Sequence, residues 1–184
     1  VYTANADQRM LFRSTKMHNT VTVDGESQDL LLREHIWSYN RNAIPQVLSW
    51  TSNEDHDKIT AVHNGYLRLP EPVQHERTII FNKTDCTWII KDRITGCGQH
   101  TLEWFFHFDV GIDFIINENI VETKCKDEKN IMMIFEPVNG LQLRKERSYI
   151  SKSYGIKEEG YVLAALINDR TPVEITINIM KIVK

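Results

Sequence analysis

Polar and apolar residues alternate along most of the chain, which is the pattern of strands with one buried face. Val21 and Val23 point one way while Thr20, Thr22 and Asp24 point the other, and Asp24-Gly25 then supplies a turn. The same pattern, bounded by turn residues, predicts further strands at 44–51, 58–68, 76–82, 86–92, 100–108, 112–117, 120–125, 130–136, 141–147, 161–168 and 173–182. About a dozen strands are therefore expected, without a helix of about ten residues or more.

The strand predicted at 100–108 carries the most apolar face. Four large apolar residues alternate there with polar ones, namely Leu102, Trp104, Phe106 and Phe108. Such a face needs another sheet to cover it, so the chain is predicted to be all-β, an antiparallel β-sandwich, with an open barrel as the lesser alternative. His100 and His107 fall on opposite faces of this strand and are interpreted as structural.

Two connections are predicted from their composition. Residues 93–99 contain Gly96 and Gly98, which permit positive φ, so strands 86–92 and 100–108 are expected to form a hairpin. The polar stretch 51–58 is expected to be a mobile loop.

Length and charge exclude several classes of protein. The 184 residues fit one domain, predicted as 1–184, and with a net charge of −3 and scattered Lys and Arg a nucleic-acid partner is not expected. The longest apolar runs fall short of the about 20 residues that span a bilayer, so no membrane span is expected. Cys86, Cys97 and Cys125 are odd in number and lack C-x-x-C spacing, which argues against a zinc knuckle or a disulfide framework.

Candidate chemistry concentrates before the first strand, in the segment 13–25. By parity His18 lies on the face opposite Val21 and Val23, so its imidazole is predicted to point out of the core. An outward imidazole can donate or accept a proton near neutral pH. From the residues alone, a histidine that binds loop backbone remains the alternative.

The same segment resembles the signature R-S-T-x-x-H-N-T-V-x-V-D-G of the heparinase II/III-like C-terminal domain at every specified position. The resemblance continues through three further stretches and weakly through a fourth, at 63–69, 75–78, 98–108 and 153–155. The resemblance implies that this chain is a fragment of a larger protein and that the N-terminal α/α toroid of that protein is missing from it. The opening Val1-Tyr2-Thr3 fits such a truncated start.

The resemblance also implies a function. Members of this family are polysaccharide lyases that break a glycosidic bond to a uronic acid by β-elimination, with the substrate in the cleft between toroid and sandwich. It implies a proton-transfer role for His18, while the toroid supplies a Tyr and an Asn or His. The expected partners are this toroid and an acidic polysaccharide such as a glycosaminoglycan, alginate or a bacterial exopolysaccharide.

Three further residues are candidates for substrate contact, each with an alternative. Arg13 has the geometry to bind a carboxylate with two hydrogen bonds, or it makes a salt bridge or a backbone contact. Asn19 orients His18 or caps the local turn. Tyr66, like Tyr154, has an aromatic ring that can stack on a sugar or pack in the core.

Some relatives carry a structural zinc in this sandwich, and His63 and His75 are the candidate ligands here. Position 20 is Thr, so a His-x-His pair starting at His18 is absent, and no evident Cys or carboxylate completes a tetrahedral set. No cofactor and no tightly held metal are therefore expected. The rival function is a non-catalytic carbohydrate-binding or scaffolding β-sandwich, and the substrate class predicts a periplasmic or secreted location.

Overall fold

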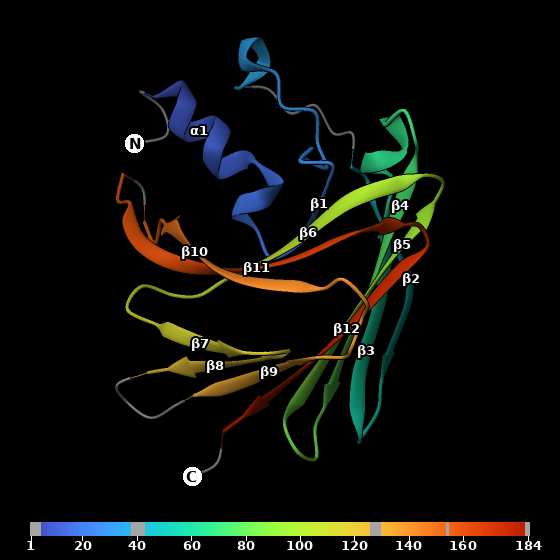
Figure 1. Cartoon of the computed structure of the whole chain (residues 1–184), viewed down its shortest axis with the longest axis vertical. Helices are drawn as coiled ribbons and strands as arrows, with labels where there is room; N and C mark the ends of the chain where they lie inside the picture. Colours follow the sequence, from blue (N-terminus) through green and yellow to red (C-terminus); the bar gives the residue numbers. More distant parts are fainter. Residues whose placement is uncertain (1–4, 38–42, 126–129, 154, 183–184) are drawn as a thin grey trace.

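The chain folds as two antiparallel sheets packed face to face (Figure 1), in a computed structural model that describes residues 5–37, 43–125, 130–153 and 155–182. The smaller sheet has the strand order β1 (Val21–Val23), β6 (Gln99–His107), β11 (Glu158–Arg170) and β10 (Gln142–Ile150). The larger sheet has the order β2 (Pro45–Ser52), β3 (His56–His63), β4 (Val73–Asn82), β5 (Thr87–Gly96), β12 (Val173–Lys181), β9 (Ile131–Phe135), β8 (Ile120–Lys124) and β7 (Asp113–Asn117). The predicted antiparallel β-sandwich is thus confirmed.

The core lies between the two sheets and is made by the predicted apolar faces. On β6 the residues Leu102 and Trp104 are fully buried, and Phe106 is nearly so, as is Phe108 directly after the strand. They pack with apolar residues of the larger sheet such as Ile94, Ile175 and Ile177. Burial of each such side chain stabilises the fold by about 1.5–3 kcal/mol, and alternation along each strand is what directs them to one side.

The predicted hairpin of strands 86–92 and 100–108 is wrong. β5 pairs with β4 and β12 in the larger sheet, whereas β6 pairs with β1 and β11 in the smaller one. The two strands therefore contribute to the core from different sheets, with Ile94 of β5 and Leu102 of β6 in the same core cluster. Gly96 and Gly98, with φ of 154° and 92°, sit at the corner where the chain changes sheets.

Two other predicted boundaries differ from the structure. The stretch 51–58 is mostly strand, because the side chain of Asn53 accepts hydrogen bonds from the backbone of Asp55 and His56 and closes a tight turn between β2 and β3. The predicted strand 58–68 ends at His63, and a 3₁₀ helix, Gly65–Arg68, follows it.

The N-terminal segment lies over the outer face of the smaller sheet (Figure 1). It contains the helix α1 (Ala6–Arg13) and a 3₁₀ helix, Thr15–Met17, and a third short 3₁₀ helix spans Arg33–His35. The alternation pattern did not reveal α1, whose start is capped by the side chain of Asn5. In the described ranges no helix has the length and apolar character needed to cross a membrane.

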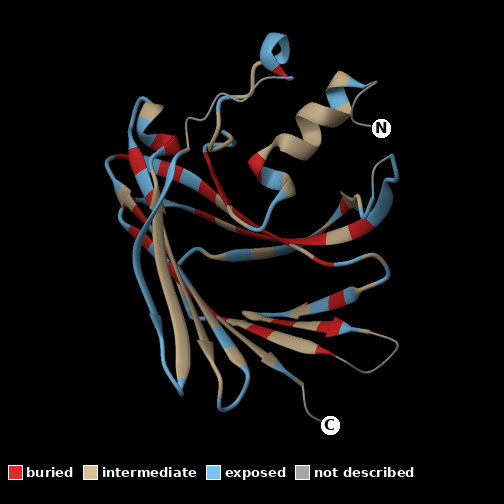
Figure 2. Cartoon of the chain, turned by 180° about the vertical axis from the view of Figure 1, so that it is seen from behind, coloured by how far each residue is buried: buried red, intermediate tan, exposed pale blue. Residues whose placement is uncertain are grey.

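Burial is uneven along the larger sheet (Figure 2). Buried residues follow the strands that face the smaller sheet, whereas every residue of the edge strand β2 is exposed. The three cysteines are free thiols, with Cys86 and Cys97 exposed and Cys125 partly buried. Tyr154 and Val1-Tyr2-Thr3, which the family resemblance singled out, lie outside the described residues.

Candidate functional site

His18 lies between the 3₁₀ helix Thr15–Met17 and β1, and it is exposed, as predicted. The parity argument itself does not hold, because the strand begins only at Val21 and Thr22, expected on the same outward face, is buried. Its Nε2 atom is 3.1 Å from the carbonyl oxygen of Phe12. A carbonyl oxygen only accepts hydrogen bonds, so Nε2 carries the hydrogen and Nδ1 of the neutral ring keeps its lone pair. Nδ1 has no hydrogen-bond partner in the described part of the chain.

Two surface hollows meet at His18. One has a volume of about 410 Å³ and is lined by Phe12, Met17, His18, His107, Tyr149, Ile150 and Ser151. The other, of about 420 Å³, is lined by Arg9, Phe12, Arg13, Thr15, His18, Gln28, Asp29 and Leu31. His18 and Phe12 belong to both linings, so the imidazole forms part of the wall between the two hollows.

A second histidine, His107, lines the first of these hollows. Its Nε2 donates to the Lys16 carbonyl at 2.9 Å, and its Nδ1 lies 3.3 Å from the Ser148 hydroxyl. Burial lowers the pKa of His107, and the nearby His18 lowers it further. The sequence analysis interpreted His107 as structural from its strand position, and only the packing of the Thr15–Met17 helix on β6 reveals that it borders the site.

Asn19 fixes the turn that carries His18. Its side-chain oxygen accepts a hydrogen bond from the backbone of His107 at 2.8 Å, and its carbonyl oxygen accepts one from Arg77 at 2.5 Å. Of the two expected roles, this geometry matches the one in which Asn19 holds the local turn, because its side chain binds the backbone of β6.

Arg13 lines the second hollow together with Arg9. Both side chains donate a hydrogen bond to the carbonyl oxygen of Ile36, that of Arg9 at 2.9 Å. The contact of Arg13 is therefore the backbone contact that the sequence left open. Asp29 is the only carboxylate in this lining, against two guanidinium groups, so cations predominate beside His18.

Tyr66 is placed differently from the expected sugar contact. It is fully buried, and its hydroxyl donates to the Val21 carbonyl at 2.6 Å. Burial raises the pKa of this hydroxyl well above its usual value. In this structure the ring therefore has no face open to a substrate, and Tyr66 instead ties the 3₁₀ helix Gly65–Arg68 to β1.

His63 and His75, the candidate metal ligands, belong to a partly buried series of hydrogen bonds, in which His75 and Asp92 are the buried members. The backbone N–H of Gly65 donates to His63 Nδ1 at 3.2 Å, so His63 Nε2 carries the hydrogen that it donates to His75 Nδ1 at 3.1 Å. His75 Nε2 then lies 2.8 Å from Asp92 Oδ1. Burial, together with His75, lowers the pKa of His63 to about 4, which keeps this imidazole neutral.

The series of hydrogen bonds continues from Asp92 to Arg77 and ends at the turn that carries His18. Arg77 donates to both carboxylate oxygens of Asp92, at 2.7 and 2.6 Å, and its third nitrogen donates to the Asn19 carbonyl. Burial alone would raise the pKa of Asp92, but the charge and hydrogen bonds of Arg77 and His75 lower it to about 2. Asp92 is therefore ionised although its side chain has no exposed surface.

This arrangement does not fit a metal ion. All four ring nitrogens of His63 and His75 are already hydrogen-bonded, and Asp92 is held by Arg77. Within the described ranges no three or more His, Cys, Asp or Glu side chains are grouped to hold a metal. A structural zinc normally needs four ligands with available lone pairs.

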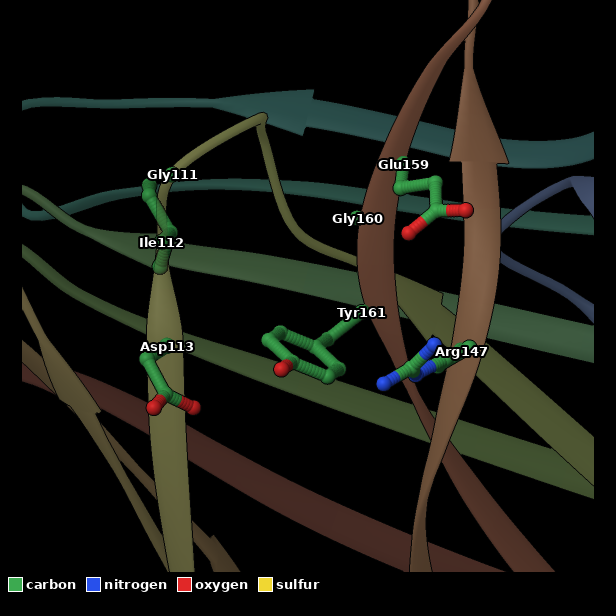
Figure 3. Close-up of a pocket in the computed structure, with 7 residues that line it drawn as sticks. All are labelled: Gly111, Ile112, Asp113, Arg147, Glu159, Gly160 and Tyr161. Carbon is green, nitrogen blue, oxygen red and sulfur yellow. The ribbon is translucent and has the colours of Figure 1, made fainter.

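A third hollow, of about 280 Å³, lies between β7 and the strands β10 and β11 (Figure 3). The Tyr161 ring lies between the Ile112–Asp113 backbone and Arg147, and Glu159 is on the same side as Arg147. Lys145 is paired with Asp113. The lining of this hollow has two carboxylates and one guanidinium, and Lys145 beside it neutralises Asp113. The hollow contains none of the predicted site residues, so it is a weaker candidate than the hollows around His18.

Three solved structures resemble this fold. The heparan sulfate lyase HepC from Pedobacter heparinus superposes with a TM-score of 0.80 at 18% identity, covering 98% of this chain and 27% of that protein. A heparinase III with methylated lysines gives 0.81 at 17% identity, covering 100% and 27%. Another heparinase III gives 0.75 at 14% identity, covering 97% and 26%. At these identities the likeness shows the fold alone.

This chain spans about a quarter of the length of those lyases. Among curated proteins, none matches its sequence. Residues 1–175 match the sequence model of the family described as heparinase II/III-like, C-terminal. That match covers nearly the whole chain and includes the His18 segment, both hollows and the buried network. The chain therefore belongs to the heparinase II/III-like C-terminal family.

Proposed function

We propose that this chain is the β-sandwich part of a polysaccharide lyase that cleaves a uronic-acid-containing polysaccharide by β-elimination, and that His18 transfers a proton in the reaction. The observation that carries the proposal is the exposed imidazole at the junction of two hollows, with Nδ1 unpaired in the described structure. An N-terminal α/α toroid faces this surface in the proposed whole protein and supplies the remaining catalytic groups.

The chemistry requires three things at the uronate. A base removes the C5 proton, the C4–O bond breaks as the C4=C5 double bond forms, and an acid protonates the departing O4, so no water is consumed. The C5 proton is weakly acidic until the neighbouring carboxylate is neutralised and the developing enolate charge is stabilised. His18 is suited to the proton transfer, and Arg13 and Arg9 supply positive charge beside it.

The substrate class follows from this charge. Two guanidinium groups against one carboxylate in the lining of the second hollow favour an anionic polymer. Similar solved structures are named heparan sulfate lyase and heparinase III, so heparan sulfate is the first glycosaminoglycan to test, with alginate and a bacterial exopolysaccharide as alternatives. Because such polymers occur outside the cytoplasm, we propose a periplasmic or secreted location.

The test uses the polypeptide that carries this chain together with its toroid, and it follows the absorbance of the unsaturated uronate product. Turnover of one of these polymers is expected, and His18→Ala should lower kcat by about 100-fold or more, the low end for a general acid or base. The isolated 184-residue chain should be inactive, since groups from both domains must be oriented together.

Near-normal turnover of the His18→Ala enzyme would remove His18 from the mechanism. Binding of the polymers without turnover by the whole protein would instead favour the rival function, a non-catalytic carbohydrate-binding or scaffolding domain.

A further inference from the structure

The buried network reaches from the larger sheet to the turn that carries His18. Arg77 lies on β4, and the segment that it contacts at Asn19 leads into β1 of the smaller sheet. On its other side Asn19 is bound to the backbone of His107, on β6. The backbone of Phe105 also donates to the Thr20 carbonyl at 2.9 Å. The turn is therefore held by the smaller sheet along one edge and by Arg77 from the larger sheet.

Stability alone is a poor explanation for this network. A buried ion pair costs desolvation energy that its attraction barely offsets, and apolar residues of similar volume are often at least as stabilising. What the pair provides is direction. The guanidinium is planar, so the two hydrogen bonds to Asp92 fix the orientation of the whole group, and with it the third nitrogen, which points to the Asn19 carbonyl.

We propose that Arg77 is a positioning residue, which the buried Asp92 orients and which sets the place of the His18–Asn19 turn relative to the larger sheet. This inference rests on the proposed function, because the position of the turn matters for catalysis only if His18 transfers a proton. The network holds the turn even in the isolated chain, so the positioning can be measured without any assay of activity.

His75 and His63 extend the same support. Asp92 is held on one side by the two nitrogens of Arg77 and on the other by His75, whose second ring nitrogen is bound by His63. Hydrogen bonds therefore run without a break from the Gly65 backbone through His63, His75, Asp92 and Arg77 to the Asn19 carbonyl. These hydrogen bonds fix the orientation of the Asp92 carboxylate, and the carboxylate in turn fixes the orientation of the Arg77 guanidinium.

The first test is hydrogen exchange in the 184-residue chain. Arg77→Lys keeps the charge, but one ammonium group cannot hold both carboxylate oxygens and the Asn19 carbonyl in a fixed plane. The backbone amide of His107, which donates to the Asn19 side chain, should then exchange at least about 10-fold faster, whereas the amide of Leu163 in the core should not change. Arg93→Lys, an exposed position on β5, is the matched control and should change neither amide.

If the Arg77→Lys variant does not fold, a second variant without either charge of the pair provides the test. The double variant Asp92→Asn, Arg77→Gln removes both charges together and leaves neither ion unpaired. The glutamine side chain that replaces Arg77 is shorter and no longer reaches Asn19, so the His107 amide should again exchange faster. Unchanged exchange of this amide in a folded variant would overturn the proposal.

The second test measures catalysis in the toroid-containing protein. Arg77→Lys should lower kcat by about 10–100-fold with KM changed by no more than about threefold, because displacement of a catalytic group affects the transition state more than ground-state binding. Arg93→Lys should leave both constants unchanged. Faster exchange together with an unchanged kcat would support the positioning of the turn but contradict the proton-transfer role of His18, so the two ideas fail separately.

Discussion

Two pairs of histidines in this chain differ in their hydrogen bonding. In one pair, the partly buried His63 and the buried His75, every ring nitrogen has a hydrogen-bond partner, and the hydrogen bonds pass on to the ionised Asp92. In the other pair, the exposed His18 and the partly buried His107 bind backbone carbonyls through Nε2, and His18 retains an unpaired Nδ1 in the described structure. The same residue type therefore serves as a support where all its lone pairs are used, and as a candidate acid or base where one remains.

Arg77 joins the two regions, since it binds Asp92 at one end and the Asn19 carbonyl at the other. His63 and His75 are thus connected, through Asp92 and Arg77, to the turn of a site that they do not touch. The following predictions test the contrast between a closed supporting network and an open reactive surface.

The largest effect on stability is expected in the closed network, from Asp92→Asn. This variant leaves the Arg77 charge without its buried partner, and loss of one member of a buried pair typically costs about 3–5 kcal/mol. Urea unfolding followed by circular dichroism measures the loss. Asp113→Asn, in an exposed pair with Lys145, is the control and should cost far less. Equal losses in the two variants would mean that Asp92 is not a central support.

Acid should weaken the same network. The pKa of His63 is about 4 in the folded chain, below its unfolded value of about 6.5, so the unfolded state binds more protons between these values. Stability should therefore fall as the pH drops from about 6.5 to about 4, by on the order of 2–3 kcal/mol for this residue. The measurement is the difference in unfolding free energy between pH 7 and pH 4.5, for the native chain and for His63→Leu.

The variant His63→Leu should lose most of that pH dependence, because it removes the group responsible. An equal slope in the two proteins would assign the acid sensitivity to other groups. Asp92 adds to the acid sensitivity only below about pH 4, because its pKa is lowered from the ordinary carboxyl value to about 2 and its stabilising contribution is lost as the pH falls between these two values.

On the open side, substitution of His18 should hardly affect folding. The residue is exposed, so His18→Ala should change the free energy of unfolding by no more than about 0.5 kcal/mol. Thermal and urea unfolding of the isolated chain measure this change. A loss as large as that of Asp92→Asn would show that His18 is a structural residue, and the contrast between the two pairs would collapse.

Metal removal should have the smallest effect. Because the nitrogens of His63 and His75 already bind protein groups, we expect no stoichiometric zinc and no shift of the melting temperature on addition of a chelator. Elemental analysis of protein purified without an affinity tag that binds metal is the measurement. Near-stoichiometric zinc, lost together with thermal stability on chelation, would contradict the closed network.

Local pattern predicted much of the fold but not all of its connections. Alternation along the chain placed Leu102, Trp104 and Phe106 in the core, because a strand turns every second side chain to the same side. It did not distinguish a hairpin from a crossover at Gly96 and Gly98, since both need a sharp turn and both bury the same faces. The short helix α1 was missed because alternation identifies strands, and its eight residues contain no buried side chain.

The residues of the candidate site were likewise predicted only in part from the sequence. The exposure of His18 was predicted correctly, but the parity used for it was wrong for Thr22, which is buried. The sequence pattern was not enough for Tyr66, because burial at the end of a strand depends on what packs over it, and here the ring lies under β1. His107 was missed as a neighbour of the site, since it comes from β6 and meets the Thr15–Met17 helix only after folding.

The sequence by itself determined the class of fold, the inner faces of the strands and the family, because each of these depends on residues close together in the chain. The tertiary structure decided which sheet each strand joins and where Tyr66 and His107 lie. It also decided that His63, His75, Asp92 and Arg77 form one network ending at Asn19, a residue 58 positions from Arg77. Such contacts depend on the pairing and packing of distant strands, and these are selected by the burial of the whole core rather than by any local pattern.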